Sequence, residues 1–206
     1  MPEIMENPVM ENPLLQLVQD GPLVIRSRMP ADEFDRFVLQ NSDLRIERDK
    51  FGTITIHPPM TYNSAKNESR AFFFLQMWGH FNPQLGDTLS PSASFNLPDG
   101  SQNKADGAFV PAHKTALLSS DELDGIPHLV PDFVMEMRSK TDRLATLKKK
   151  MEEVWMANGV RLAWLLDPQN QKAWVYRSDG SVEDIPDFDQ KLSGEDVLPG
   201  FELDLQ

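Results

Sequence analysis

A carboxylate in the middle of an apolar strand is the feature that most constrains how this chain folds. Residues 131–140 read PDFVMEMRSK, and Glu136 stands among Phe133, Val134, Met135 and Met137. Apolar side chains on both faces indicate a strand that is covered by protein on both sides. An isolated ionised carboxylate in such a place costs many kcal/mol, so Glu136 must be neutralised, paired or bound to a metal.

The segments around this strand predict one mixed sheet flanked by helices. The strand at 132–138 precedes a helix that begins at Thr141 and stops at Gly159, and two apolar strands follow, VRLAWLLD and KAWVYRSDG. The segments before it are a helix from residue 30, a hairpin of LRIER and TITIHPP, a helix over 63–81, strands at 86–96 and 106–112, and a loop over 113–129. This order favours an α/β or α+β domain.

The length of the chain, 206 residues, suits one domain with a terminal extension. We predict that this domain spans residues 30–206. Residues 1–29 are predicted to form a peripheral or disordered N-terminal arm, because the repeated Asn-Pro steps in MENPVMENP disfavour a helix. Within this arm, Leu14, Leu15, Leu17 and Val18 are the side chains expected to dock.

Composition narrows the function classes. The chain has no cysteine, which excludes disulfides and thiolate chemistry and fits a cytoplasmic location. No apolar run approaches the ~18 residues of a membrane span, so no membrane partner is expected. A net charge of −12 opposes nonspecific binding to nucleic acid. It does not exclude an enzyme whose acidic residues hold divalent cations, because bound metal reverses the local charge.

A second acid, Asp106, opens the short strand DGAFV. An aspartate before a glycine is often only a turn residue, and Glu136 has its own structural alternative, an ion pair with Arg138 or Lys140. If the two strands are neighbours, however, Asp106 and Glu136 form a hard-cation site suited to Mg²⁺ or Mn²⁺.

A lysine run, Lys148, Lys149 and Lys150, lies on the helix after Glu136. Such a run is most often a solvated face. Lys150 is followed at once by Met151, near the seam between the wet and buried faces, so it is our candidate for a lysine that points back toward the carboxylates. There it would orient or deprotonate a water, or stabilise charge on a phosphate oxygen. Acid, acid and lysine are parts that a phosphodiesterase needs.

The motifs KADGAFV, DLRIERDKFGTITIHPP and the block from 131 to 176 resemble the Uma-two family of restriction endonucleases, over roughly residues 30–205. That family is assigned to the PD-(D/E)XK, restriction-endonuclease-like superfamily. The resemblance implies a central mixed sheet flanked by helices and metal-dependent hydrolysis of DNA. It also implies Asp106, Glu136 and Lys150 as catalytic residues, Asp106 and Glu136 as ligands of Mg²⁺ or Mn²⁺, and Glu47 as a weaker candidate ligand.

The chain departs from the family pattern at four points. Ala105 replaces the proline usual before Asp106, and Arg138 holds the lysine position of the strand motif. Arginine cannot act as a base at neutral pH but can clamp a phosphate. Thr53 stands where many relatives carry an acid. Lys149 remains an alternative to Lys150, because the spacing to the helix end can differ by one residue.

Other interpretations stay open. A catalytically inactive binding module with the same fold is favoured by the net charge, Arg138 and Thr53, and a smaller phosphorylated substrate is a third alternative. Glu68 could add a carboxylate, but we expect an exposed helix charge. The four histidines show no paired ligand spacing. By analogy with dimeric relatives of this fold, an edge strand near residues 172–186 is expected to pair in a homodimer.

Overall fold

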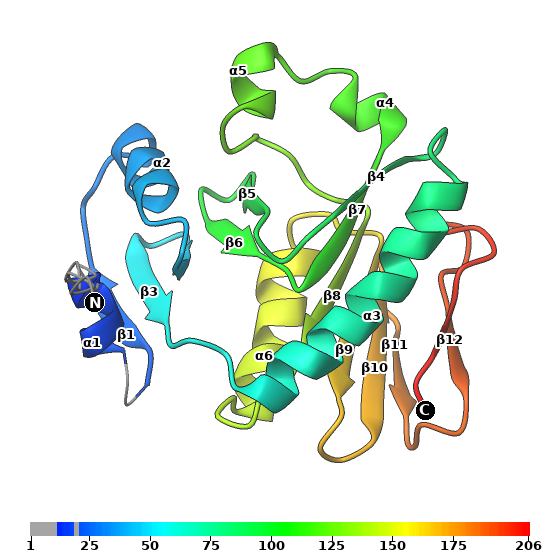
Figure 1. Ribbon diagram of the computed structural model, residues 1–206. Coiled ribbons are helices and arrows are strands. Elements are labelled where there is room, and N and C mark those ends of the chain that lie inside the picture. Colours follow the sequence, from blue (N-terminus) through cyan, green and yellow to red (C-terminus); the bar gives the residue numbers. More distant parts are fainter. Residues whose placement is uncertain (1–11, 19–20) are drawn as a thin grey trace, which may run out of the picture.

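Two β-sheets meet where the chain passes directly from a strand of one sheet to a strand of the other. We call this junction the corner. The computed structural model describes residues 12–18 and 21–206. Strand β6 (Gln102–Lys104) belongs to the first sheet and β7 (Gly107–Pro111) to the second. Figure 1 shows β6 and β7 following each other along the chain. Only Ala105 and Asp106 separate them, so Asp106 lies at the point where the chain passes from one sheet to the other.

The larger sheet has six strands in the order β11-β10-β9-β8-β7-β4. Its centre is the pair β8 and β9, which is parallel and places Glu136 beside Leu165, whereas the other pairs are antiparallel. Parallel neighbours require a long crossover, and the helix between them supplies it. The remaining bounds are β4 (Gly86–Leu89), β8 (Phe133–Met137), β9 (Leu162–Asp167), β10 (Lys172–Arg177) and β11 (Val182–Ile185).

The smaller sheet has five strands in the order β1-β3-β2-β6-β5. Its hairpin of β2 and β3 pairs Glu47 with Thr55, and β2 joins β6 at Arg48 and Gln102. Through this second pairing the hairpin is carried to the corner that holds Asp106. The bounds are β1 (Leu23–Arg26), β2 (Arg45–Arg48), β3 (Thr53–His57) and β5 (Ser94–Asn96). A separate pair consists of β12 (Lys191–Ser193) and β13 (Glu202–Asp204).

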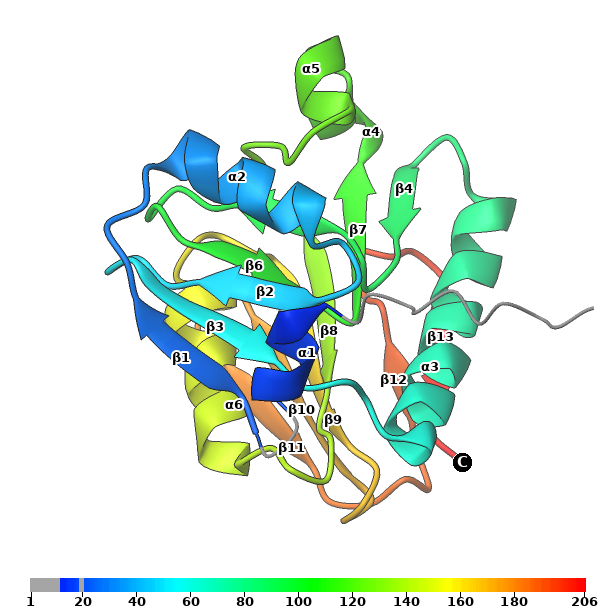
Figure 2. The same cartoon turned by 60° about the vertical axis from the view of Figure 1, so that its left-hand side comes forward.

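Helices cover the two faces of the larger sheet (Figures 1 and 2). Because side chains alternate along a strand, Met135 packs on the side of α3 (Tyr62–Phe81). Val134 packs on the other side, against Met151 and Trp155 of a π-helical turn, Met151–Met156, that continues α6 (Leu144–Lys150). Glu136 shares the face of Val134. The shorter helices are α1 (Pro13–Leu17), α2 (Ala31–Gln40), α4 (Ala112–Thr115) and α5 (Ser120–Leu123).

The predicted fold class, a mixed α/β or α+β architecture with flanking helices, is confirmed. The prediction of a single sheet was wrong, because the hairpin of β2 and β3 belongs to a second, five-stranded sheet. The strand predicted over 86–96 is two strands, β4 and β5, in different sheets. Pro91 lies between them, and because proline has no N–H to donate it interrupts the hydrogen bonding of a continuous strand. The loop predicted over 113–129 contains α5 and most of α4. No helix within the described ranges has the length and apolar character needed to cross a bilayer.

The arm predicted over residues 1–29 is not wholly separate from the domain. Strand β1 pairs with β3 as the edge of the smaller sheet, so the boundary drawn at residue 30 falls next to an element of that sheet. Val18 is fully buried and Leu14 and Leu15 pack beside it, as expected for docking side chains, whereas Leu17 is exposed. The rest of the predicted arm, residues 1–11 and 19–20, lies outside the described residues.

We expect Gly86→Ala to destabilise the protein because the residue sits at φ +148° with its missing Cβ 2.1 Å from the Val110 carbonyl oxygen. Backbone has to move to accept the methyl group, which should cost roughly 2–4 kcal/mol in the free energy of unfolding. Gly180→Ala is the matched control: φ is +85° but no atom lies within 4 Å, so strain alone should cost about 1 kcal/mol. Urea unfolding of both variants compares the two, and equal losses would contradict the close contact.

Candidate functional site

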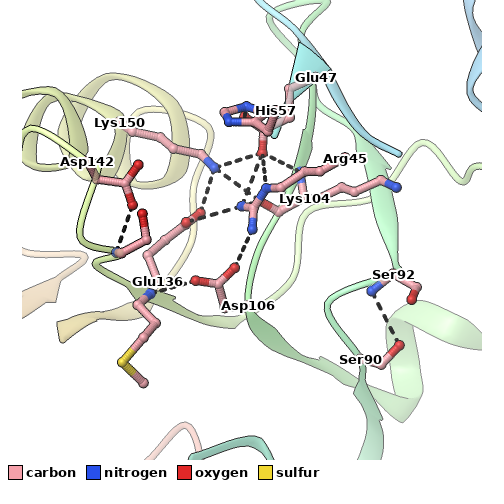
Figure 3. Close-up of polar contacts among 12 residues, drawn as sticks. Arg45, Glu47, His57, Ser90, Ser92, Lys104, Asp106, Glu136, Asp142 and Lys150 are labelled. Atoms are coloured by element: carbon pink, nitrogen blue, oxygen red, sulfur yellow. Dashed lines mark hydrogen bonds and ion pairs between the residues drawn. The ribbon is translucent and has the colours of Figure 1, made fainter. Parts of the chain in front are cut away.

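The corner between the sheets gathers acidic and basic side chains from segments far apart in the chain (Figure 3). Arg45 and Glu47 come from β2, Asp106 from the corner itself, Glu136 from β8 and Lys150 from the last residue of α6. The acids are almost fully buried: their side chains are 11 %, 4 % and 3 % exposed for Glu47, Asp106 and Glu136. The three predicted carboxylates and the predicted lysine therefore lie in one cluster.

A guanidinium stands at the centre of this cluster. Arg45 forms ion pairs with Asp106 Oδ1, with Glu47 Oε1 at 3.3 Å and with Glu136 Oε2 at 3.4 Å. It also donates to the main-chain carbonyl of Lys104 at 3.1 Å. Burial alone would lower the pKa of Arg45, but the surrounding carboxylates, Asp106 foremost, raise it well above its usual value. Arg45 is therefore a permanent cation here.

Lys150 closes the other side of the cluster. Its ammonium lies 2.8 Å from Glu136 Oε1 and 2.9 Å from Glu47 Oε1, and it donates to the carbonyl of Lys104 at 3.1 Å. Burial would lower the pKa of Lys150, but Glu136 and Glu47 outweigh it and raise the pKa above its usual value. Lys150 is therefore protonated at neutral pH, which favours an electrostatic role over that of a general base.

Glu136 has several polar partners, which offset the cost of burying its charge. Besides Lys150 and Arg45, its Oε1 accepts a hydrogen bond from the Trp155 indole N–H at 2.8 Å. Burial raises the pKa of Glu136, with Lys150 opposing and Asp106 reinforcing the shift. The neighbouring cations thus favour the ionised form of Glu136, whereas the neighbouring Asp106 disfavours it.

Asp106 and Glu47 are also held in place. Asp106 Oδ2 accepts from the Met137 backbone N–H at 2.6 Å, so the corner residue is bonded to β8 itself. Glu47 Oε2 lies 3.2 Å from His57 Nε2 on the neighbouring strand. Burial would raise the pKa of Glu47, but Lys150 and Arg45 lower it well below its usual range. The pKa of Glu47 is thus shifted in the direction opposite to that of Glu136, which burial raises.

Two residues that the sequence left as alternatives lie elsewhere. Arg138 pairs with Asp167 at 2.7 Å and donates to the Asp142 carbonyl, so it does not fill the space between Asp106 and Glu136. Lys149 is 68 % exposed, and its ion pair is with Glu153 at 3.6 Å on its own helix. The structure thus places Lys150, and not Lys149, in the cluster.

Sequence reasoning missed Arg45 and misjudged Glu68. In RIER, Arg45 and Glu47 are two residues apart on one strand, so alternation already places them on one face. Glu68 was expected to be exposed, but it is only 7 % exposed on α3. Burial, together with Asp106 and Glu136, raises its pKa to about 7. It is a fourth carboxylate at the edge of the cluster, and no ion pair to it is formed by the residues that the structure describes.

The donors suit a hard divalent cation in chemistry but not in spacing. Carboxylate and carbonyl oxygens are what Mg²⁺ prefers, at ~2.1 Å from the ion. Within residues 12–18 and 21–206, no three Asp, Glu or His side chains stand close enough together to hold a metal. The cause is visible in the contacts: the carboxylates surround the guanidinium of Arg45 at hydrogen-bond distances, which are longer than metal–ligand distances.

The fold and the site together define a mixed α+β protein with an acidic, lysine-bearing cluster at the junction of two sheets. A solved structure from Anabaena variabilis, described as "a putative nuclease belonging to DUF820", has a similar fold. Its TM-score is 0.69 at 16 % identity, covering 86 % of this chain and 95 % of that one. The model of the Uma-two family, described as "Putative restriction endonuclease", matches residues 31–206, so the chain belongs to that family. No curated protein matches it significantly.

The raised pKa of Glu68 predicts a specific pH dependence of stability. Glu68 titrates at about 7 in the folded protein, against 4.5 ordinarily. Between these values the unfolded chain has released a proton that the folded chain keeps, so this residue lowers stability as pH rises from about 4.5 to 7. Glu68→Gln removes the effect. The variant should gain stability relative to wild type across that window, with no further change above about pH 8.

Urea unfolding at pH 5, 6, 7 and 8 measures this difference in the absence of divalent ions. Glu153→Gln, an exposed carboxylate on the helical segment after Lys149, is the control and should show a constant difference from wild type. A Glu68→Gln difference that does not change with pH would contradict the shifted pKa.

Proposed function

We propose that this protein is a divalent-metal-dependent endonuclease that hydrolyses phosphodiester bonds in DNA. The observation that supports this most is the convergence of Glu47, Asp106 and Glu136, from three separate strands or strand ends, with Lys150 beside them. Burying three acids together costs stability, and such a cost is typical of a site that serves a cation. Family membership supports the same chemistry.

Asp106, Glu136 and Glu47 are the residues that would hold Mg²⁺ or Mn²⁺. When bound, such an ion supplies an activated water and neutralises charge on the phosphate. In the hydrolysis, the water oxygen forms a bond to phosphorus, the bond to the leaving oxygen breaks, and the leaving oxygen gains a proton. A bound ion also offsets the repulsion between DNA and a chain of net charge −12.

Lys150 has a defined part in this proposal. Its ammonium is protonated and held by Glu47 and Glu136, so it is placed to stabilise negative charge that develops on a phosphate oxygen. Trp155, whose indole N–H binds Glu136, orients that carboxylate. Asp106 is oriented by the Met137 backbone N–H. The other oxygen of each of these two carboxylates, Asp106 Oδ1 and Glu136 Oε2, faces Arg45.

The alternative function is a binding module without catalysis. The specific observation in its favour is that Arg45 and Lys150 already neutralise much of the charge of the acids, so that the cluster can serve as an internal ion-pair network. In that case the two sheets and not the cluster would provide the functional surface. Cleavage assays separate the two functions, because only the nuclease depends on both a divalent ion and the acids.

Asp106→Asn and Glu136→Gln should each lower Mn²⁺-dependent cleavage of plasmid DNA by at least about 100-fold, because each removes a charged ligand. Agarose-gel assays over a metal concentration series measure the rate, and thermal unfolding checks that the variants fold. Glu153→Gln is the control, because Glu153 is exposed and its ion pair is with Lys149 and not with a member of the cluster. Cleavage that persists undiminished in both variants would reject this site.

Lys150 and Lys149 form a matched pair for a second test. Lys150→Met should reduce the cleavage rate by roughly 100-fold, since it removes a cation beside the reacting phosphate. Lys149→Met removes an exposed lysine whose partner is Glu153, and it should leave the rate within about twofold of wild type. The opposite result would transfer the role to Lys149.

A further inference from the structure

We propose that Arg45 occupies the position of the divalent cation and that metal binding displaces its guanidinium. Arg45 is then an intrinsic competitor that sets the ion concentration at which the site becomes loaded. This inference rests on the metal site of the proposed function. It goes beyond that function because it assigns a role to a residue outside the acid–acid–lysine set.

The first argument is the identity of the oxygen atoms around Arg45. The guanidinium contacts one carboxylate oxygen each from Glu47, Asp106 and Glu136, and the main-chain carbonyl of Lys104 (Figure 3). Three carboxylate oxygens and a carbonyl are a ligand set that Mg²⁺ and Mn²⁺ accept. The arginine therefore uses the same atoms that an ion would use, and both cannot be bound to them at once.

The second argument is distance. The contacts of Arg45 with Glu47 and Glu136 measure 3.3 and 3.4 Å, whereas Mg²⁺ holds oxygens at ~2.1 Å. A planar guanidinium keeps the carboxylates apart, which explains why no three of the described acids or histidines are close enough for a metal. Binding an ion requires the guanidinium to leave and the oxygens to draw inward by about an ångström.

The third argument identifies Arg45, and not Lys150, as the cation that leaves. Arg45 is 26 % exposed, compared with 13 % for Lys150 and 4 % for Asp106, so it is the most exposed member of the cluster. Asp106 pairs with Arg45, and within the described ranges no ion pair joins it to Lys150. An ion that uses Asp106 must therefore compete with Arg45 directly.

Arg45 also has a clear purpose when no ion is bound. Three buried carboxylates without a counter-charge would repel one another. The two positive charges of Arg45 and Lys150 face these carboxylates and offset that repulsion while no ion is bound. Because a divalent ion must replace this guanidinium, competition with Arg45 sets the ion concentration at which the site becomes loaded.

Arg45→Met tests the proposal through binding of Mn²⁺ alone, measured by isothermal titration calorimetry without DNA. Methionine keeps the apolar stem but removes the charge and donors. The variant should bind Mn²⁺ at least about tenfold more tightly than wild type, equivalent to ~1.4 kcal/mol. Arg161→Gln is the matched control, because Arg161 also bridges two carboxylates, Asp132 and Asp196, but lies outside the cluster. Its affinity should equal that of wild type.

Thermal unfolding gives a second measurement. In EDTA, Arg45→Met should unfold at a lower temperature than wild type, and saturating Mn²⁺ should raise its Tm by more than it raises that of wild type. If Arg45→Met does not fold without metal, Arg45→Lys replaces it. That variant keeps the charge but loses the fork that reaches several oxygens, and its Mn²⁺ affinity should still exceed that of wild type.

Weaker or unchanged Mn²⁺ binding in the folded variants would overturn the proposal and make Arg45 a structural ion-pair partner. Absence of Mn²⁺ binding to both wild type and variants would overturn it as well. Failure of the proposed function is a separate result. A protein that cleaves no DNA, yet gains Mn²⁺ affinity in Arg45→Met, keeps the displaced arginine and loses only the nuclease assignment.

Discussion

The balance of charge around Glu136 is the interaction on which the rest of the site depends. The strand that carries it is covered on both faces, so the carboxylate has no access to bulk water and needs partners from the protein. It finds three of them: the ammonium of Lys150, the indole of Trp155 and the guanidinium of Arg45. Each partner belongs to a different element, so the position of Glu136 ties together α6, its π-helical continuation and the start of β2. Loss of any one leaves a buried charge partly uncompensated.

Topology explains why these partners arrive at one point. The parallel pair β8 and β9 forces the chain to cross one face of the sheet, and that crossover ends with Lys150 and Trp155 above Glu136. The change of sheet between β6 and β7 places Asp106 beside β8, where its carboxylate caps the Met137 N–H. A strand shifted by one residue would turn Glu136 toward α3 and away from the lysine. The register of β8 is thus as important for the site as the identity of its residues.

Sequence patterns predicted the main helices, most of the strands and the acids of the cluster, but not strand β6 or the surroundings of the acids. Glu136 could be found because a charge inside an apolar strand is conspicuous, and Lys150 because its helical neighbours are apolar. Arg45 was overlooked because a residue at a hairpin end is ordinarily solvated, whereas here it donates a hydrogen bond to the carbonyl of Lys104 at the end of β6. Strand β6 was missed for a related reason. Gln102, Asn103 and Lys104 are buried but polar, and hydrophobic alternation cannot indicate a strand built from such residues.

The exposure of Glu68 was also mispredicted from the hydrophobic pattern of its helix. Aromatic and aliphatic residues occur around much of α3, and several of them are exposed, so the helix sequence gives no clear sign of which face is inward. Glu68 is buried, and burial together with the charges of Asp106 and Glu136 raises its pKa to about 7. A double positive charge at the neighbouring acids would favour its ionised form.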